Sequence, residues 1–211
     1  MTVVVPIDRD NPDPEAIYAA ASVLEQGGLV VAQTETIYAL LASAFVVDTL
    51  ARAFDAGNRP YSAPLPVMAA DLADVESLAR NIQKPAYRLF DKYWPGPLTA
   101  ILLRQPTVSM VVTGGRNTIG VRVPGPSPAR EIMLSYGAPI VCPPACLYGR
   151  RFPLSATDAL EDLDGKVDLI LDSGASSQNL PSTVIDLTAY PPSILREGIL
   201  NGEEILQFYN A

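Results

Sequence analysis

Apolar residues follow two patterns that alternate along the chain. Strands are predicted at residues 29–32, 65–69, 98–103, 118–123, 139–141, 167–171, 183–187 and 194–195. Several of them are continuous apolar runs, which are typical of strands buried on both faces of a sheet. Apolar residues three or four positions apart are typical of amphipathic helices, and this spacing follows Pro14, Asp48, Asp71, Pro85, Ser127 and Ser155. The alternation predicts an α/β or α+β fold with a twisted, largely covered mixed sheet.

Capping residues bound several of the predicted helices. Ser127 is expected to cap a helix that ends before Gly137, and Ser155 opens a capping box. Asp48 is expected to cap a helix that ends at Gly57. No Ser/Gly-rich, charged or low-complexity linker divides the sequence, so we predict one domain over residues 1–211.

Charge and residue usage narrow the functions that the sequence allows. The chain carries a net charge of −8, which argues against a broad nucleic-acid-binding face because such faces are basic. It has no histidine, which excludes Ser-His and Cys-His catalysis. Only Lys84, Lys92 and Lys166 are lysines, and the other basic residues are arginines. We therefore expect any anion site to be built from guanidinium groups, which bind phosphates and carboxylates bidentately.

Two further expectations concern location and metals. No apolar run approaches the roughly 20 residues of a membrane span, and the first residues lack the basic and apolar regions of a signal peptide, so we expect a cytoplasmic protein with no membrane partner. Cys142 and Cys146 are interpreted as two free, partly buried thiols, since without histidine they cannot form a four-ligand zinc site. We predict no metal site made of protein side chains.

Polar residues gather where apolar strands end, and ligands of open α/β sheets bind at such ends. Thr34, Glu35 and Thr36 follow the run at residues 29–32, and Tyr38 comes just behind them. Two hydroxyls, a carboxylate and a phenol are suited to orienting a small polar ligand. The alternative is a helix that starts here with Thr34 as its N-cap.

Arginines near other strand ends are candidate anion ligands. Arg59 either clamps a phosphate or lies in a surface turn. Arg122 lies between valines within a strand and either meets an anion or points to solvent from the outer face. Arg196 follows a further strand, and Arg150 and Arg151 are either part of a site or a solvated pair.

The order of these segments resembles the YrdC family, which includes the L-threonylcarbamoyladenylate synthases. The segments that carry the resemblance are G-G-L-V-V at 27–31, T-E-T-x-Y at 34–38, R-P at 59–60, W-P-G-P-L-T at 94–99, G-V-R-V-P at 120–124, S-T-V-I-D at 182–186 and R-E-G at 196–198. The resemblance extends over about residues 14–206. It implies a YrdC-like fold, in which a twisted sheet and its helices surround a large concave cavity.

The resemblance also implies a reaction and its residues. ATP with Mg²⁺, bicarbonate and L-threonine would give threonylcarbamoyl-adenylate and pyrophosphate, for the threonylcarbamoyl modification of tRNA. Thr34, Glu35 and Tyr38 would hold the threonine. Arg59 and Arg122 would be catalytic, because they offset charge as pyrophosphate leaves. The residues that the resemblance places around the nucleotide are Arg59, Arg122, Ser182 and Arg196.

Five positions differ from the family pattern. Gly57 stands in place of a lysine, Ala63 and Cys146 in place of asparagines, Met68 in place of a histidine and Pro144 in place of a serine. Losing one charged hydrogen-bond partner costs roughly 1.5–3 kcal/mol. Several such losses would remove ordinary ATP affinity unless other arginines compensate, for which Arg52, Arg150 and Arg151 are the candidates.

Three functions follow as alternatives. The first is a working threonylcarbamoyl-adenylate synthase with a rearranged site. The second is a diverged relative that binds another nucleotide or amino acid, or uses another amine. The third is a non-catalytic protein that binds RNA, including double-stranded RNA, or a tRNA-modification protein in the same cavity.

Overall fold

The computed structural model describes residues 1–211, which form one mixed sheet of eleven strands with seven helices. The strands are β1 (Val3–Pro6), β2 (Val30–Gln33), β3 (Tyr38–Ser43), β4 (Val67–Met68), β5 (Ala79–Arg80), β6 (Leu98–Arg104), β7 (Thr118–Arg122), β8 (Ile140–Val141), β9 (Leu169–Asp172), β10 (Thr183–Asp186) and β11 (Ser193–Arg196). The helices are α1 (Pro14–Glu25), α2 (Val47–Ala56), α3 (Leu72–Leu78), α4 (Lys84–Tyr93), α5 (Pro128–Tyr136), α6 (Ala156–Leu163) and α7 (Gly202–Asn210).

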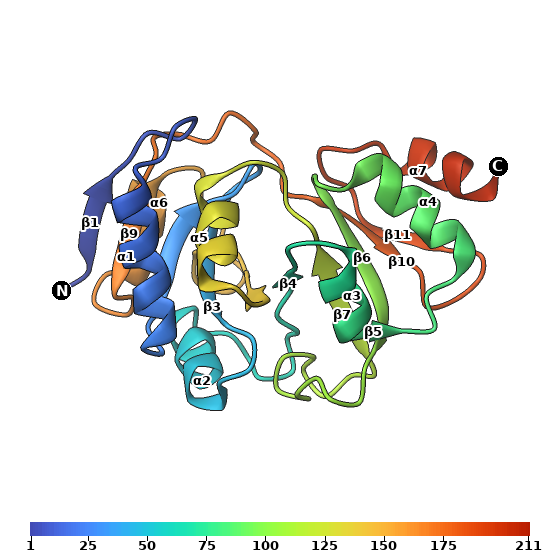
Figure 1. Ribbon diagram of the computed structural model, residues 1–211, viewed down its shortest axis with the longest axis horizontal. Coiled ribbons are helices and arrows are strands. Elements are labelled where there is room, and N and C mark those ends of the chain that lie inside the picture. Colours follow the sequence, from blue (N-terminus) through green and yellow to red (C-terminus); the bar gives the residue numbers. More distant parts are fainter.

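The strand order gives the molecule two wide parts joined by a narrow centre. The order is β1-β9-β2-β3-β8-β4-β7-β6-β10-β11, and β5 pairs with β6. Strands β8 and β4, at the centre, have two residues each and pair antiparallel. Figure 1 shows the N-terminus beside β1 at one end of the long axis and the C-terminus beside α7 at the other. Loops that flank the short central strands therefore lie between the two parts of the sheet.

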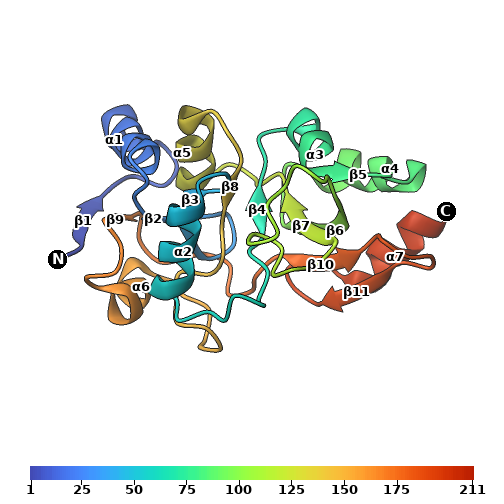
Figure 2. The same cartoon turned by 90° about the horizontal axis from the view of Figure 1, so that it is seen from below.

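Helices cover both faces of the sheet around β2 and β3. Figure 2 shows α1 and α5 side by side on one face and α6 on the opposite face. The alternation along β2 matches this arrangement, because Val30 and Ala32 pack in the cluster under α1 and α5, whereas Val31 packs in the larger cluster on the other face. Burying one such side chain contributes about 1.5–3 kcal/mol. No helix combines the length and apolar character needed to cross a membrane.

The structure confirms the predicted mixed α/β fold and most of its helices. Gly137 ends α5 with φ of +75°, and Ser155 forms the predicted capping box. The predicted cap at Asp48 is wrong, because α2 begins after Val46, whose side chain makes no capping bond. The alternative of a helix starting at Thr34 is also wrong, because a turn there joins β2 to the antiparallel strand β3.

Candidate anion-binding cavity

The cavity lies between the two parts of the sheet and has a volume of about 530 Å³. The turn between β2 and β3 and the loop after β8 line it from one part, and β6, β7, β10 and β11 line it from the other. Four arginines face it, and no Asp, Glu, Asn or Gln does; the arginines are Arg59, Arg122, Arg150 and Arg196. Positive charge is therefore concentrated in the cavity of a chain whose net charge is −8.

Arg122 is positioned by the alternation of β7. Gly120 and Arg122 share the face toward the cavity, while Val121 packs into the core between them. Arg122 is only 7% exposed, so the alternative that it points to solvent is wrong. Its guanidinium donates to the hydroxyl of Thr36 (3.3 Å) and to a carboxylate oxygen of Glu35. Its Nε–H is buried without an acceptor.

The turn before β3 explains why a buried strand ends in hydroxyl and carboxyl side chains. The Thr34 hydroxyl donates to the Ile37 carbonyl (2.7 Å) and accepts the Thr36 and Ile37 N–H groups (both 3.1 Å), which closes the turn. Glu35 accepts the Gly125 N–H (3.0 Å) besides pairing with Arg122. The turn thus connects the two parts of the sheet through the Glu35–Arg122 ion pair.

Arg59 follows the end of α2 and is the least satisfied cation of the cavity. It takes part in none of the five ion pairs of the molecule. Its Nε–H is buried without an acceptor, and its guanidinium lies over the Tyr148 ring, 4.9 Å from the centroid. Burial lowers the pKa of Arg59 below its ordinary value. A guanidinium left in this state favours an anion beside it.

Arg196 and Ser182 lie together at the opposite wall. Arg196 donates from Nε and a terminal nitrogen to the Ser182 carbonyl (3.2 and 2.8 Å), and from the same terminal nitrogen to its hydroxyl (3.1 Å). The hydroxyls of Ser182 and Thr99 are 2.8 Å apart. Burial lowers the pKa of Arg196, and the positive charge of Arg122 lowers it further. The structure thus brings Arg59, Arg122, Ser182 and Arg196 to one cavity.

Two of the residues predicted to hold threonine do not line the arginine-lined cavity. Tyr38 is fully buried and does not line the cavity, and its hydroxyl donates to the Gly174 carbonyl (2.6 Å) and accepts the Ser173 N–H (3.1 Å). Burial raises the pKa of this phenol above its ordinary value of 10.0. Glu35 lines a neighbouring hollow instead, so Thr34 alone of the three faces the arginine-lined cavity.

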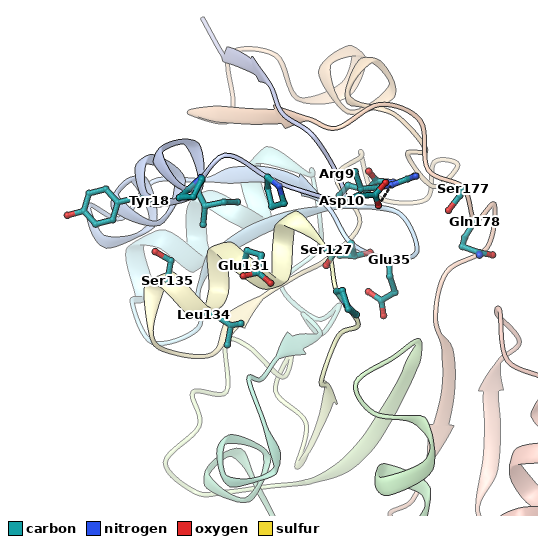
Figure 3. A pocket seen from close by; sticks show the side chains of 16 residues that line it. Arg9, Asp10, Tyr18, Glu35, Ser127, Glu131, Leu134, Ser135, Ser177 and Gln178 are labelled. Carbon is teal, nitrogen blue, oxygen red and sulfur yellow. Dashed lines mark ion pairs between the residues drawn. The ribbon is translucent and has the colours of Figure 1, made fainter.

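The neighbouring hollow is larger, about 1030 Å³, and lies along α1 and α5 (Figure 3). Its charged residues are three carboxylates and one arginine, namely Asp10, Glu35, Glu131 and Arg9. Arg9 is paired with Asp10 at 3.5 Å, as the dashed line in Figure 3 shows. The hollow therefore offers no free cation, and its acidic lining makes it a poorer place for a phosphate than the smaller cavity.

Of the arginines expected to compensate for altered positions, one lies at the cavity. Arg150 lines it and is paired with Asp162 (3.0 Å). Arg52 pairs with Asp168 and Arg151 with Asp158, both 2.9 Å, and neither lines the cavity. Cys142 and Cys146 are free thiols, as predicted, and both line the cavity.

Two aromatic residues line the cavity: Tyr148, which lies in a segment that the sequence marks as a candidate but to which it assigns no role, and Phe152, which sequence reasoning missed. Both come from the loop between β8 and α6, and each lies against a cavity arginine: Tyr148 against Arg59, and Phe152 against Arg196 at 5.7 Å. The available signal was the placement of aromatic residues beside Arg150 and Arg151 after a strand end.

These features define an α/β protein whose central cavity is lined by guanidinium groups. The family described as telomere recombination, which groups Sua5, YciO and YrdC proteins, matches residues 22–198. A threonylcarbamoyl-AMP synthase of Pyrococcus abyssi is 38% identical over 205 residues, which are 97% of this chain and 60% of that protein. The chain belongs to the Sua5/YciO/YrdC family, which confirms the resemblance read from the sequence.

Solved structures agree with this assignment. P. abyssi Sua5 complexed with L-threonine matches with a TM-score of 0.94 at 37% identity, over 98% of this chain and 61% of that one. Escherichia coli YciO matches with a TM-score of 0.85 at 29% identity, over 95% of this chain and 98% of that one. The chain thus spans about three fifths of the length of its P. abyssi relative.

Proposed function

We propose that this chain is a nucleotidyltransferase of the threonylcarbamoyl-AMP synthase type, and that the arginine-lined cavity binds the phosphates of ATP. The observation that carries the proposal is the pair of buried Nε–H groups on Arg59 and Arg122, which have no acceptor in the protein. Phosphate oxygens are suited to such donors, because guanidinium–phosphate hydrogen bonds are charge-assisted. The P. abyssi relative carries the same activity in its name, and its Sua5 structure holds L-threonine.

The chemistry that we propose needs no histidine or cysteine nucleophile. An amine and bicarbonate form a carbamate and water, and the carbamate oxygen then attacks the α-phosphorus of ATP. The bond from that phosphorus to the oxygen bridging the β-phosphate breaks, and pyrophosphate leaves with the electron pair. Arg59 and Arg122 would align the phosphates and offset the charge that develops on the leaving group. Both thiols have raised pKa values through burial, which makes them poor nucleophiles.

The residues of the cavity do not form a metal cage. The chain contains no group of three or more His, Cys, Asp or Glu side chains placed to hold a metal ion. Both carboxylates that contact cavity arginines are engaged: Glu35 by Arg122 and the Gly125 N–H, and Asp162 by Arg150 and the Leu147 N–H. Protein ligands for Mg²⁺ therefore do not fit this site, and we assign no step to the ion.

Release of pyrophosphate tests the proposal. The protein is incubated with ATP, bicarbonate and L-threonine, and pyrophosphate is measured with a coupled phosphate assay. We expect release that needs all three substrates and is lost in Arg122→Ala. Arg88→Ala is the control for the loss of an arginine elsewhere, because Arg88 lies over the Phe208 ring, 5.3 Å from its centroid, and does not line the cavity. Background rates with all substrates present would refute the proposed synthase activity.

A second candidate is a family member that uses an amine other than threonine. It is favoured by the state of the residues assigned to threonine, since the Tyr38 hydroxyl and the Thr34 hydroxyl are both engaged inside the protein. Its test is the same assay with a panel of amino acids and amines in place of threonine. Pyrophosphate release with another amine but not with threonine would support it. Release with threonine and with no other amine of the panel would exclude it.

We do not assign an RNA partner to the cavity. The net charge of −8 opposes an extended polyanion, although four arginines suit a small one. Binding of tRNA or double-stranded RNA in gel-shift titrations at low salt is expected to be undetectable. Binding with a steep salt dependence would favour the RNA alternative over the synthase.

A further inference from the structure

The acidic hollow along α1 and α5 is not used by the proposed reaction. Its volume is about 1030 Å³, and its walls come from α1 and the segment before it, from α5, from the turn after β2 and from the loop after β9. Figure 3 shows its labelled side chains spread from Tyr18 and Ser135 at one end to Ser177 and Gln178 at the other. A hollow of this shape suits an extended ligand.

Gln33, the last residue of β2, supplies the hollow with a free hydrogen-bond donor. The residue is only 2% exposed and lines the hollow. Its Oε1 accepts the Ser173 hydroxyl (2.6 Å), which fixes the amide plane, whereas its Nε2 donates to no acceptor within the protein. A buried donor without a partner favours a ligand that brings an acceptor oxygen.

The charged side chains of the hollow favour a cation in the same ligand. Glu131 lies in the first turn of α5, and its carboxylate takes part in none of the five ion pairs of the molecule. Asp10 and Glu35 add negative charge, and Arg9, which pairs with Asp10, is the one cation of the lining. The hollow therefore disfavours an anion and favours an ammonium or guanidinium group beside Glu131.

Gln33 and Glu131 together discriminate between classes of ligand. A polyamine supplies cations but no acceptor for Gln33, because an ammonium group only donates. A neutral peptide supplies carbonyl oxygens but no charge for Glu131. A peptide segment with basic side chains supplies both.

We infer that the acidic hollow binds an extended basic segment of a partner protein. A backbone carbonyl of that segment accepts from the Gln33 amide, and a lysine or arginine side chain pairs with Glu131. The inference goes beyond the proposed function and does not rest on it, because the arginine-lined cavity takes no part in this binding.

Amide NMR titrations of the full chain test the inference with three probes: tetralysine and tetraserine, both acetylated and amidated, and spermine. Tetralysine and spermine carry the same positive charge, so backbone carbonyls are what distinguishes them. We expect tetralysine to shift the side-chain amide signal of Gln33 and to bind about two- to tenfold more tightly than spermine, which is the effect of one hydrogen bond. Tetraserine should not bind.

Three variants separate the two contacts. Glu131→Gln should weaken tetralysine and spermine alike, by about 1.5- to 5-fold, as one exposed ion pair does. Gln33→Met should remove the advantage of tetralysine and leave the Kd for spermine unchanged. Glu161→Gln is the matched control, because Glu161 is an exposed glutamate of α6, on the opposite face of the sheet, and it should change neither Kd.

Equal binding of tetralysine and spermine would overturn the inference, since the hollow would then hold any polycation. Absence of shifts with all three probes, or an unchanged Kd for tetralysine in Glu131→Gln, would overturn it as well. Urea unfolding shows whether Gln33→Met still folds, and if it does not, the comparison of probes and Glu131→Gln decide. None of these outcomes bears on the proposed function, which pyrophosphate release tests separately.

Discussion

Replacing Arg59 by methionine should weaken nucleotide binding without weakening the fold. The Arg59 side chain has no ion-pair partner, and its Nε–H is buried without an acceptor. Leaving such a donor unsatisfied costs about 1–3 kcal/mol, whereas its stacking on the half-exposed Tyr148 ring contributes about 0.5–1 kcal/mol. The variant should therefore gain about 0–2 kcal/mol in free energy of unfolding, and each kcal/mol raises Tm by about 2–4 °C at this chain length.

The same substitution should be costly for the ligand. Two charge-assisted hydrogen bonds to phosphate, at about 1.5–3 kcal/mol each, amount to about 3–6 kcal/mol. That loss raises the Kd for ATP by about 10²- to 10⁴-fold. Urea unfolding gives the stability and calorimetry gives the Kd, with Arg88→Met as the control for loss of an arginine–aromatic contact outside the cavity. A less stable Arg59→Met variant that binds ATP normally would refute the reasoning, because Arg59 would then be a structural residue.

Three further predictions concern groups around the cavity. Glu35→Gln removes the carboxylate of the Glu35–Arg122 pair, so the free energy of unfolding should fall by about 1–3 kcal/mol. The Kd for tripolyphosphate should decrease. If urea unfolding and calorimetry show both values unchanged, the role of that pair is contradicted. Tyr38→Phe removes the hydroxyl that bonds the Gly174 carbonyl and the Ser173 N–H, so it should cost about 1–3 kcal/mol and leave pyrophosphate release unchanged; a raised KM for threonine would instead support the threonine-binding role predicted for Tyr38. Burial raises the pKa of the Cys142 thiol from 9.0 to about 12, so below pH 9 the thiol is protonated in both states, and above it only the unfolded state loses the proton. Stability should therefore fall by about 1.4 kcal/mol per pH unit between pH 9 and 12, and urea unfolding of Cys142→Ala at pH 8 and pH 10 should lack that component; an equal loss in the variant would show that Cys142 does not titrate in this way.

The fold was largely predictable because its signals are local. Continuous apolar runs identified most strands, and caps such as Ser127 and Ser155 located helix starts. Strand β1 was missed, since its exposed valines lie on an edge, and β3 was not distinguished from a helix start at Thr34. Both depend on pairing with segments that are distant in the sequence or across a turn, which apolar periodicity does not report.

The residues of the arginine-lined cavity were predictable in part as a set, but their geometry was not. Ordered motifs identified Arg59, Arg122, Ser182 and Arg196, and the structure brings these four together. Tyr38 was grouped with Thr34 because the two are close in sequence. Strand alternation and the Gly174 contact direct the Tyr38 phenol into the core on the far side of the strand. Spacing along a chain does not determine which of two neighbouring polar groups faces a cavity.

A crystal structure of the protein grown with ATP tests the central claim most directly. We predict phosphate oxygens within hydrogen-bonding distance, about 2.7–3.2 Å, of both Nε of Arg59 and Nε of Arg122. Nucleotide bound in the acidic hollow along α1 and α5, or an empty arginine-lined cavity at saturating ATP, would contradict it.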